Sequence, residues 1–287
     1  MSKSKSAPDD ILIGRSPKAY DNQEFIHSRD GRVIRLLAEY MQPDQHFRKH
    51  NIKQMVVFFG SARTPSKMDF QTKMNNLRAQ LDNPRYPDKD AIKKKIAHLE
   101  KIQHTTEYYE DAVSLARMIS EWSNTLPPSQ RLNICTGGGP GAMEAANRGA
   151  SMAGASTIGL NISLPFEQHP NQFISPHLNF EFHYFFMRKF WFVYLSTAFV
   201  VFPGGFGTLD ELMEILTLLQ TKKLKHTRPI VLYNEKFWKT LLNFDFLIEE
   251  GMISADDMQL LKFANTPEEA FNFLKDEITK SGTLKLY

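Results

Sequence analysis

The stretch FVVFPGGFGTLDELME, residues 199–214, joins an apolar run, a glycine-rich turn and a helical pattern with acidic residues near its start. A strand that stops at Pro203-Gly204-Gly205 and continues as a helix near Thr208 leaves backbone N–H groups without partners at the helix start. Such groups form a ready site for phosphate. The stretch therefore predicts a strand, turn and helix with phosphate-binding geometry.

Chain length and net charge indicate the number of domains and the kind of partner to expect. The chain has 287 residues, and because open α/β sheets reach this size we expect one domain over 1–287. Its 35 basic and 32 acidic residues give a net charge of +3, and the basic residues are spread along the chain. This balance gives no indication of a nucleic-acid partner.

Other features point to a protein of the cytoplasm. The single cysteine, Cys135, excludes an intrachain disulfide and fits a reducing compartment. Residues 1–14 are polar and lack the apolar segment of a signal peptide. The longest apolar run, residues 190–202, is shorter than the roughly 18 residues of a membrane span. We therefore expect a cytoplasmic protein without a membrane partner.

Strand and helix patterns alternate through most of the chain. This alternation predicts an α/β fold, a Rossmann-like doubly wound parallel sheet with helices on both faces. The strands are expected at 55–59, 132–136, 156–162, 179–183, 198–202, 229–233 and 258–263. The helices between and after them are expected at 107–122, 140–153, 185–194, 208–220, 237–250 and 267–279.

Two additions are predicted outside this alternation. Residues 1–50 form an N-terminal arm and helix, the helix spanning 28–41 with Ser28 as N-cap and Pro43 as its stop. Residues 65–104 form a helical hairpin inserted between the first strand and its crossover helix. The lysine run at 93–95 is interpreted as a solvated helix face.

Three glycine-containing turns follow predicted strands, at 60–63, 137–141 and 204–208. In a doubly wound sheet the carboxyl ends of all strands lie along one edge, so the three turns should converge on one crevice. None matches the P-loop pattern, and residues 137–141 lack the spacing of a dinucleotide fingerprint. The expected ligand is a monophosphate.

Four segments, in this order, also resemble one protein family. FGSAR at 59–63, TGGGPGAMEAANRGA at 136–150, Met187-Arg188-Lys189 and PGGFGTLDE at 203–211 are together similar to the motifs of the LONELY GUY (LOG) family. The resemblance implies hydrolysis of the N-glycosidic bond of a nucleoside 5′-monophosphate, either AMP or a cytokinin riboside 5′-monophosphate. The products are the free base and ribose 5-phosphate.

The same resemblance implies a homodimer or higher homo-oligomer whose aromatic surface around residues 184–192 completes the active site. Members are often labelled lysine decarboxylases. That label requires a pyridoxal-binding lysine, which this sequence does not single out. We expect no cofactor, and the nine histidines lack paired metal-ligand spacing, so no metal is expected.

The proposed chemistry assigns a role to an acid. Cleavage of an N-glycosidic bond builds positive charge on the ribose ring, which a carboxylate stabilises while it orients or deprotonates water. Glu211 is the expected catalytic group, with Asp210 and Glu214 as alternatives. A purely structural role at the helix start, worth about 0.3–1 kcal/mol, is the competing interpretation.

The remaining candidates surround this acid. Arg188 offers a fork of donors for phosphate or for a carboxylate and is assigned a catalytic role beside Glu211. A structural surface role is the alternative for Arg188, and helix-end complementation is the alternative for Glu144. The expected substrate- and phosphate-binding residues are Gly138, Gly139, Gly141, Gly204, Gly205, Gly207, Thr208, Glu144, Ser61 and Arg63.

A second hypothesis from another functional class is a non-catalytic nucleotide sensor or carrier that uses the same crevice. The presence of both Arg188 and Glu211 favours the enzyme, since a binding protein has no need of a charge-stabilising acid.

Overall fold

The computed structural model describes residues 16–165, 169–224 and 228–280 and divides the chain into two compact units, 1–42 and 43–287. The described part of the first unit contains a short turn of 3-10 helix, Ala19–Asp21, helix α1, Gln23–His27, and the start of α2, Arg32–Lys49. Residues 1–15 of the expected arm lie outside the described residues. The single domain over 1–287 stays a prediction.

Helix α2 differs from the helix expected at 28–41. Ser28 closes α1 instead of opening α2, because its hydroxyl donates to the Phe25 carbonyl at 2.7 Å. The N–H of Gly31 in turn donates to the Ser28 hydroxyl at 3.2 Å. The helix that follows therefore begins only at Arg32.

The same helix also continues past Pro43, where the sequence predicted a stop. Proline removes one backbone hydrogen bond from a helix. The residues beyond it are nevertheless held by packing, because the buried ring of Phe47 lies edge-on to Phe180 and Trp191, with centroids 5.2 and 5.3 Å apart. Tertiary packing outweighs the local penalty here.

The sheet of the second unit confirms the predicted doubly wound fold. Its described strands are all parallel and follow the order β4-β3-β2-β1-β5-β6-β7. Their bounds are Gln54–Phe59 (β1), Leu132–Thr136 (β2), Thr157–Ile162 (β3), Asn179–Phe182 (β4), Ser196–Val201 (β5), Ile230–Tyr233 (β6) and Leu261–Ala264 (β7). The chain adds β2, β3 and β4 on one side of β1 and then returns to place β5 on the other side. The strand order therefore reverses between β1 and β5.

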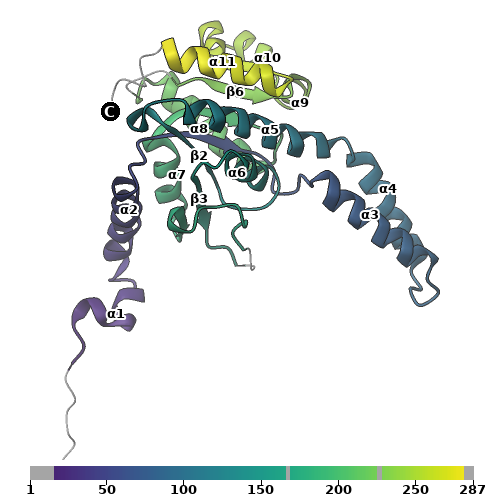
Figure 1. Cartoon of the computed structure of the whole chain (residues 1–287), viewed down its shortest axis with the longest axis horizontal. Coiled ribbons are helices and arrows are strands. Elements are labelled where there is room, and N and C mark those ends of the chain that lie inside the picture. The colour runs from purple at the N-terminus through teal and green to yellow at the C-terminus, as the bar shows by residue number, and fades with distance from the viewer. Residues whose placement is uncertain (1–15, 166–168, 225–227, 281–287) are drawn as a thin grey trace, which may run out of the picture. The chain divides into compact units, whose positions relative to one another are not determined.

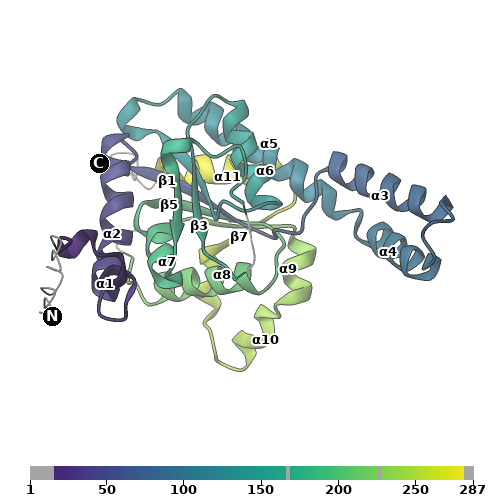
Figure 2. The same ribbon diagram turned by 90° about the horizontal axis from the view of Figure 1, so that it is seen from below.

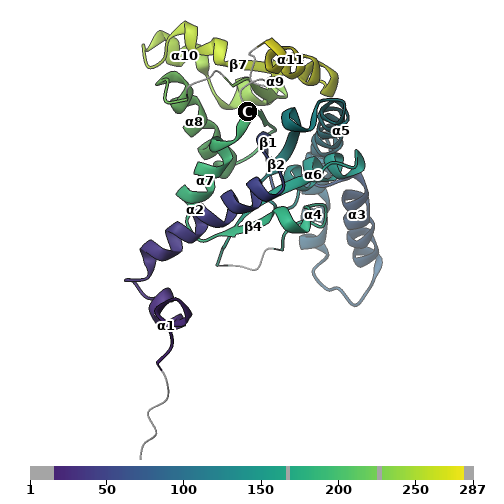
Figure 3. The same cartoon turned by 60° about the vertical axis from the view of Figure 1, so that its left-hand side comes forward.

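Helices cover both faces of this sheet (Figures 1 and 3). One face is covered by α5, Thr105–Asn124, α6, Ala142–Met152, and α11, Pro267–Lys280. The other is covered by α7, Phe185–Tyr194, α8, Phe206–Gln220, α9, Glu235–Leu241, and α10, Phe244–Glu249. Because both faces are buried, the central strands are mainly apolar, and the polar residues that start β1 and β5, Gln54, Ser196 and Thr197, are themselves buried.

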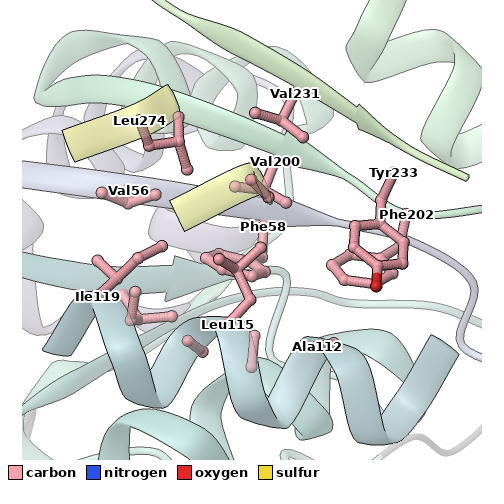
Figure 4. Packing of buried hydrophobic residues seen from close by; sticks show 14 of the residues in the cluster. Val56, Phe58, Ala112, Leu115, Ile119, Val200, Phe202, Val231, Tyr233 and Leu274 are labelled. Atoms are coloured by element: carbon pink, nitrogen blue, oxygen red, sulfur yellow. The ribbon is translucent and has the colours of Figure 1, made fainter. Parts of the chain in front are cut away.

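Successive residues of β1 point alternately into the two hydrophobic cores, one on each face of the sheet. Val56 and Phe58 of β1 belong to the core on the side of α5, whereas Met55, Val57 and Phe59 belong to the other. Figure 4 shows the first of these cores, in which Val56 and Phe58 lie between neighbouring strands and helix α5.

The predicted helical insertion is confirmed as a hairpin of α3, Lys67–Asp82, and α4, Lys89–Ile102, which lie side by side (Figure 2). The hairpin has its own small core of Phe70, Met74, Leu77, Ile92 and Leu99. The Lys89 ammonium group caps the end of α3 by donating to the carbonyls of Gln80 and Leu81, at 3.0 and 2.6 Å. The lysines at 93–95 are exposed, as expected.

The predicted bounds of two elements near the C-terminus are wrong. The helix expected at 237–250 is broken at Leu242, whose backbone is extended. Asn243 then starts a second helix, because its side chain accepts the N–H of Phe246 at 3.0 Å and so acts as an N-cap. The strand expected at 258–263 is replaced in part by a 3-10 helix, Ala255–Leu260, that leads into β7.

Within the described residues, no helix has the length and apolar character to cross a membrane.

Candidate functional site

A cavity of about 690 Å³ opens at the carboxyl-terminal edge of the sheet. The turns that follow β1 and β5 both contribute to its lining, and these two strands pair directly. Ligands of doubly wound sheets bind where the strand order reverses, which in this chain is between β1 and β5. The volume also falls in the range typical of small-molecule sites.

One wall of the cavity is the start of helix α8. Gly205 is its N-cap and supplies no side-chain hydrogen bond to the first helical N–H groups. The predicted residues Gly204, Gly205, Gly207 and Thr208 all line the cavity. Glycine is required at 204, because a Cβ there would lie 2.1 Å from the Thr208 hydroxyl oxygen. The uncapped helix start therefore offers donors and the positive end of a helix dipole to an anion.

The two residues expected to be catalytic meet at the cavity wall. The Arg188 Nη2 group of α7 donates to Glu211 Oε1 of α8 at 3.3 Å. Their side chains are only 15% and 8% exposed. Burial raises the pKa of Glu211 to about 7, although Arg188 and then Lys189 act in the opposite direction. Burial likewise lowers the pKa of Arg188, against the effect of Glu211. At neutral pH the Glu211 carboxyl group is therefore close to its ionisation midpoint.

The alternative acids lie outside the cavity lining. Lys189 Nζ contacts Asp210 Oδ2 at 2.8 Å and Glu214 Oε2 at 2.7 Å. The Asp210 side chain is 59% exposed, in contrast to the buried Glu211. Of the three acids proposed from the sequence, the structure brings only Glu211 into the cavity.

The turn after β1 brings a further cation to the same cavity. Ser61 and Arg63 both line it, as predicted. The Ser61 hydroxyl accepts the N–H of Arg63 at 3.0 Å, which fixes the shape of the turn. Arg63 is exposed, and among the described residues no carboxylate forms an ion pair with it. Its charge is therefore available to a ligand in the cavity.

The second glycine turn also reaches the cavity, as predicted, through Gly137, but its following glycines are used differently. Gly138 and Gly139 are buried and do not line the cavity. The N–H of Gly138 donates to the Thr136 hydroxyl at 3.0 Å, and the carbonyls of Gly138 and Gly139 accept from the Asn171 amide at 3.0 and 3.1 Å. These backbone groups are thus used within the fold, and their contact with a ligand stays a prediction.

Two other predicted residues of this segment, Gly141 and Glu144, also make contacts within the fold. Gly141 has a φ of +73°, and a Cβ there would lie 2.3 Å from the Ser61 carbonyl oxygen, so glycine lets the first and second turns approach each other. Glu144 is outside the lining and accepts the hydroxyl hydrogen of Tyr109 at 2.8 Å. The ligand-binding role of Gly141 and Glu144 stays a prediction as well.

Several lining residues were not anticipated from the sequence. Asn161 lies near the end of β3, and its amide group donates to Asn179 Oδ1 at 2.7 Å and to the Phe180 carbonyl at 2.9 Å. The unanticipated apolar lining includes Met143, Ile162, Leu164, Phe237 and Leu241, whereas Phe185 and Phe192, which also line the cavity, belong to the aromatic segment singled out from the sequence. Phe237 and Leu241 are four residues apart on α9, which is a readable helix pattern, but their convergence on the cavity depends on the order of the strands.

In the part of the chain that the structure describes, no group of three or more His, Cys, Asp or Glu side chains is placed to hold a metal ion.

Comparison with known proteins identifies related sequences. The family model described as "Possible lysine decarboxylase" matches residues 143–274. The cytokinin riboside 5′-monophosphate phosphoribohydrolase LOG4 of Arabidopsis thaliana is 39% identical over 83 residues, which are 28% of this chain and 38% of that protein. The probable cytokinin riboside 5′-monophosphate phosphoribohydrolase LOGL3 of Oryza sativa subsp. japonica is 36% identical over 85 residues, 29% of this chain and 39% of that protein. The chain thus spans less than half the length of these relatives.

Among solved structures, a molybdenum cofactor binding protein from Rippkaea orientalis covers 78% of this chain and 96% of its own, at 18% identity and a TM-score of 0.47.

Proposed function

We propose that this chain, whose resemblance to the LOG phosphoribohydrolases is confirmed by the related sequences, hydrolyses the N-glycosidic bond of a nucleoside 5′-monophosphate. The observation that carries the proposal is one cavity that combines an uncapped helix start with a buried carboxyl group whose pKa is about 7. The first feature suits the phosphate and the second suits the reacting sugar.

The 5′-phosphate has two sources of binding energy. The start of α8 contributes N–H groups at Gly207 and Thr208, and Arg63 contributes a guanidinium group from the turn after β1. Arg188 is less available for the phosphate, because it already donates to Glu211. Arg63 is therefore the cation that we assign to the phosphate, and Arg188 is the residue that holds the catalytic acid.

Glu211 acts on the ribose. As the bond from C1′ to the base nitrogen breaks, the ring gains oxocarbenium character, and a nearby carboxylate stabilises that charge. The same carboxylate takes a proton from the water that attacks C1′. The base leaves with the electron pair of the broken bond and receives that proton, so the products are the free base and ribose 5-phosphate. A group that titrates near neutral pH is well matched to accepting and returning this proton.

The base fits the apolar part of the cavity. Phe185, Phe237, Leu241 and Ile162 offer surfaces on which a planar heterocycle packs. AMP and a cytokinin riboside 5′-monophosphate are the two substrates that we propose. The second carries an apolar substituent on the base, and the related plant proteins are named for this substrate.

Incubation of the pure protein with a panel of nucleoside monophosphates, followed by chromatography of the released base, tests the proposal. We expect free base and ribose 5-phosphate in equal amounts from at least one member of the panel. Absence of release from every member, with a folded protein, would contradict it.

The non-catalytic sensor or carrier stays the alternative function. It is distinguished by Glu211→Gln, which in an enzyme lowers turnover strongly while nucleotide affinity is kept. A decarboxylase is disfavoured because no lysine is among the described residues that line the cavity, whereas pyridoxal chemistry requires one.

We also propose a homodimer or higher homo-oligomer in the cytoplasm. Phe185 and Phe186 of α7 are 50% and 52% exposed, and Phe185 lines the cavity, so a second copy that covers this helix would also enclose the substrate. Sedimentation equilibrium tests the assembly.

A further inference from the structure

Lys189 is a second cation that α7 presents to the acids of α8. Its side chain is only 16% exposed, and its ammonium group lies 2.8 Å from Asp210 Oδ2 and 2.7 Å from Glu214 Oε2. Burial lowers the pKa of Lys189, but the hydrogen bonds to the two acids outweigh this effect and raise it. Lys189 is therefore a charged group at neutral pH that contacts two carboxylates at once.

Those two carboxylates flank the acid to which we assign the reaction. Asp210 precedes Glu211 directly, and Glu214 lies three residues further along the helix, about one turn away. The charges that act on Glu211 are those of Arg188 and Lys189 from α7 and of Asp210 and Glu214 from its own helix, while Arg63 lines the cavity from the turn after β1. Without Lys189, two negative charges close to Glu211 would oppose its ionisation.

We propose that Lys189 is a positioning residue, which favours the ionised form of Glu211 by neutralising Asp210 and Glu214. Arg188 pairs with the catalytic carboxylate itself, whereas Lys189 contacts the neighbouring acids, adds its own positive charge near Glu211 and does not line the cavity. Its role in the reaction rests on the proposed function, but its effect on the ionisation of Glu211 does not.

The first experiment measures this ionisation without any substrate. The full chain is labelled with ¹³C at glutamate carboxyl carbons, and the signal that Glu211→Gln removes is followed from pH 4 to 9. In Lys189→Met we expect the Glu211 midpoint to rise by about 0.5–1 pH unit. In Lys189→Arg, which keeps the charge, we expect a midpoint close to that of the unmodified chain.

A charge-balanced variant separates electrostatics from packing. Lys189→Met combined with Asp210→Asn and Glu214→Gln removes the cation and both acids together, so the Glu211 midpoint should return toward its original value. If Lys189→Met alone does not fold, Asp210→Asn with Glu214→Gln in the presence of Lys189 is measured instead, and this variant should lower the midpoint.

The inference is overturned if the midpoint is unchanged in Lys189→Met, if Lys189→Arg behaves like Lys189→Met, or if the double acid substitution leaves the midpoint unchanged. When a nucleotide substrate is hydrolysed, the acidic limb of kcat/KM should shift with the midpoint. A purely structural role would instead lower the rate equally at every pH. Failure to find any hydrolysis would reject the proposed function and leave the titration result intact.

Discussion

Glu211 has properties that a solvated acid at a helix start lacks. Its side chain is 8% exposed, it contacts a guanidinium group, and burial raises its pKa to about 7. Asp210, the adjacent residue, is 59% exposed and pairs with Lys189. The sequence identifies all three acids of the segment, but the difference in burial that separates them is a property of the folded chain, in which Arg188 contacts Glu211 and Lys189 contacts Asp210.

The ionisation of Glu211 should be visible in the rate. Because the reaction needs the carboxylate, kcat/KM should fall tenfold per pH unit below about pH 7, the value to which burial raises the pKa of Glu211. Glu211→Gln should lower kcat by about 10²- to 10⁴-fold and remove this acidic limb. A limb that persists in the Gln variant would assign the titration to another group.

The raised pKa of Glu211 should also make the free energy of unfolding depend on pH. A carboxyl group whose pKa rises on folding contributes stability below its unfolded pKa, and this contribution is lost as the pH rises through the folded value. Relative to Glu211→Gln, the unmodified chain should therefore lose up to roughly 3 kcal/mol of unfolding free energy between pH 4.5 and 7. Urea unfolding of both proteins at pH 5 and 8 measures the difference. Equal changes in the two proteins would show that Glu211 does not titrate in this range.

Arg63 should control the preference for a phosphorylated substrate. Arg63→Gln should raise KM for a nucleoside 5′-monophosphate by about 10- to 100-fold, the effect of a lost charge-assisted hydrogen bond of about 1.5–3 kcal/mol. Hydrolysis of the unphosphorylated nucleoside should change little. Lys67, an exposed residue that does not line the cavity, provides the matched control as Lys67→Gln. An equal loss for nucleoside and monophosphate would place Arg63 away from the phosphate.

At the scale of elements, the glycines that were predicted to bind substrate divide into two kinds. Gly204, Gly205 and Gly207 line the cavity, whereas Gly138, Gly139 and Gly141 hold the turns against each other. Sequence spacing alone treats them as equivalent, because it shows that a turn follows a strand but not which neighbour takes up its backbone groups. Asn171, which fixes the second turn, is over 30 residues away along the chain.

This division predicts different effects of adding one methyl group. Gly141→Ala should lower the free energy of unfolding by more than about 1 kcal/mol, since it strains a backbone at φ +73° and places Cβ 2.3 Å from the Ser61 carbonyl. Gly205→Ala has no atom within 4 Å of the added Cβ and should leave stability nearly unchanged. Thermal unfolding of the two variants measures the contrast. Similar losses at both positions would refute the packing role of Gly141.

Local sequence patterns also fail to predict where some helices end. Phe237 and Leu241 reach the cavity on a short helix that ends before Leu242, because Asn243 caps a new one. The apolar residues keep a helical spacing up to Glu250, so the sequence pattern predicts one continuous helix and does not reveal this break. Likewise, Pro43 is a helix stop by local rules, but the burial of Phe47 keeps α2 intact beyond it.

For the whole molecule, the deciding feature is the strand order. Alternating strands and helices predict a parallel doubly wound sheet whose glycine turns converge on one crevice, and both are present. The order itself, which sets β1 beside β5 and brings the turns after both to one cavity, is a property of the folded chain. The contributions of Asn161, Phe237 and Leu241 follow from this order and were therefore beyond prediction from the motifs.

The measurement that tests the central claim most directly is base release from a nucleoside 5′-monophosphate by the unmodified chain and by Glu211→Gln, with nucleotide affinity determined for both. We predict rapid release by the unmodified chain and a loss of about 10²- to 10⁴-fold in the variant at similar affinity. Equal release by both proteins, or tight binding without release by either, would contradict the assignment of Glu211 as the acid that stabilises the ribosyl cation.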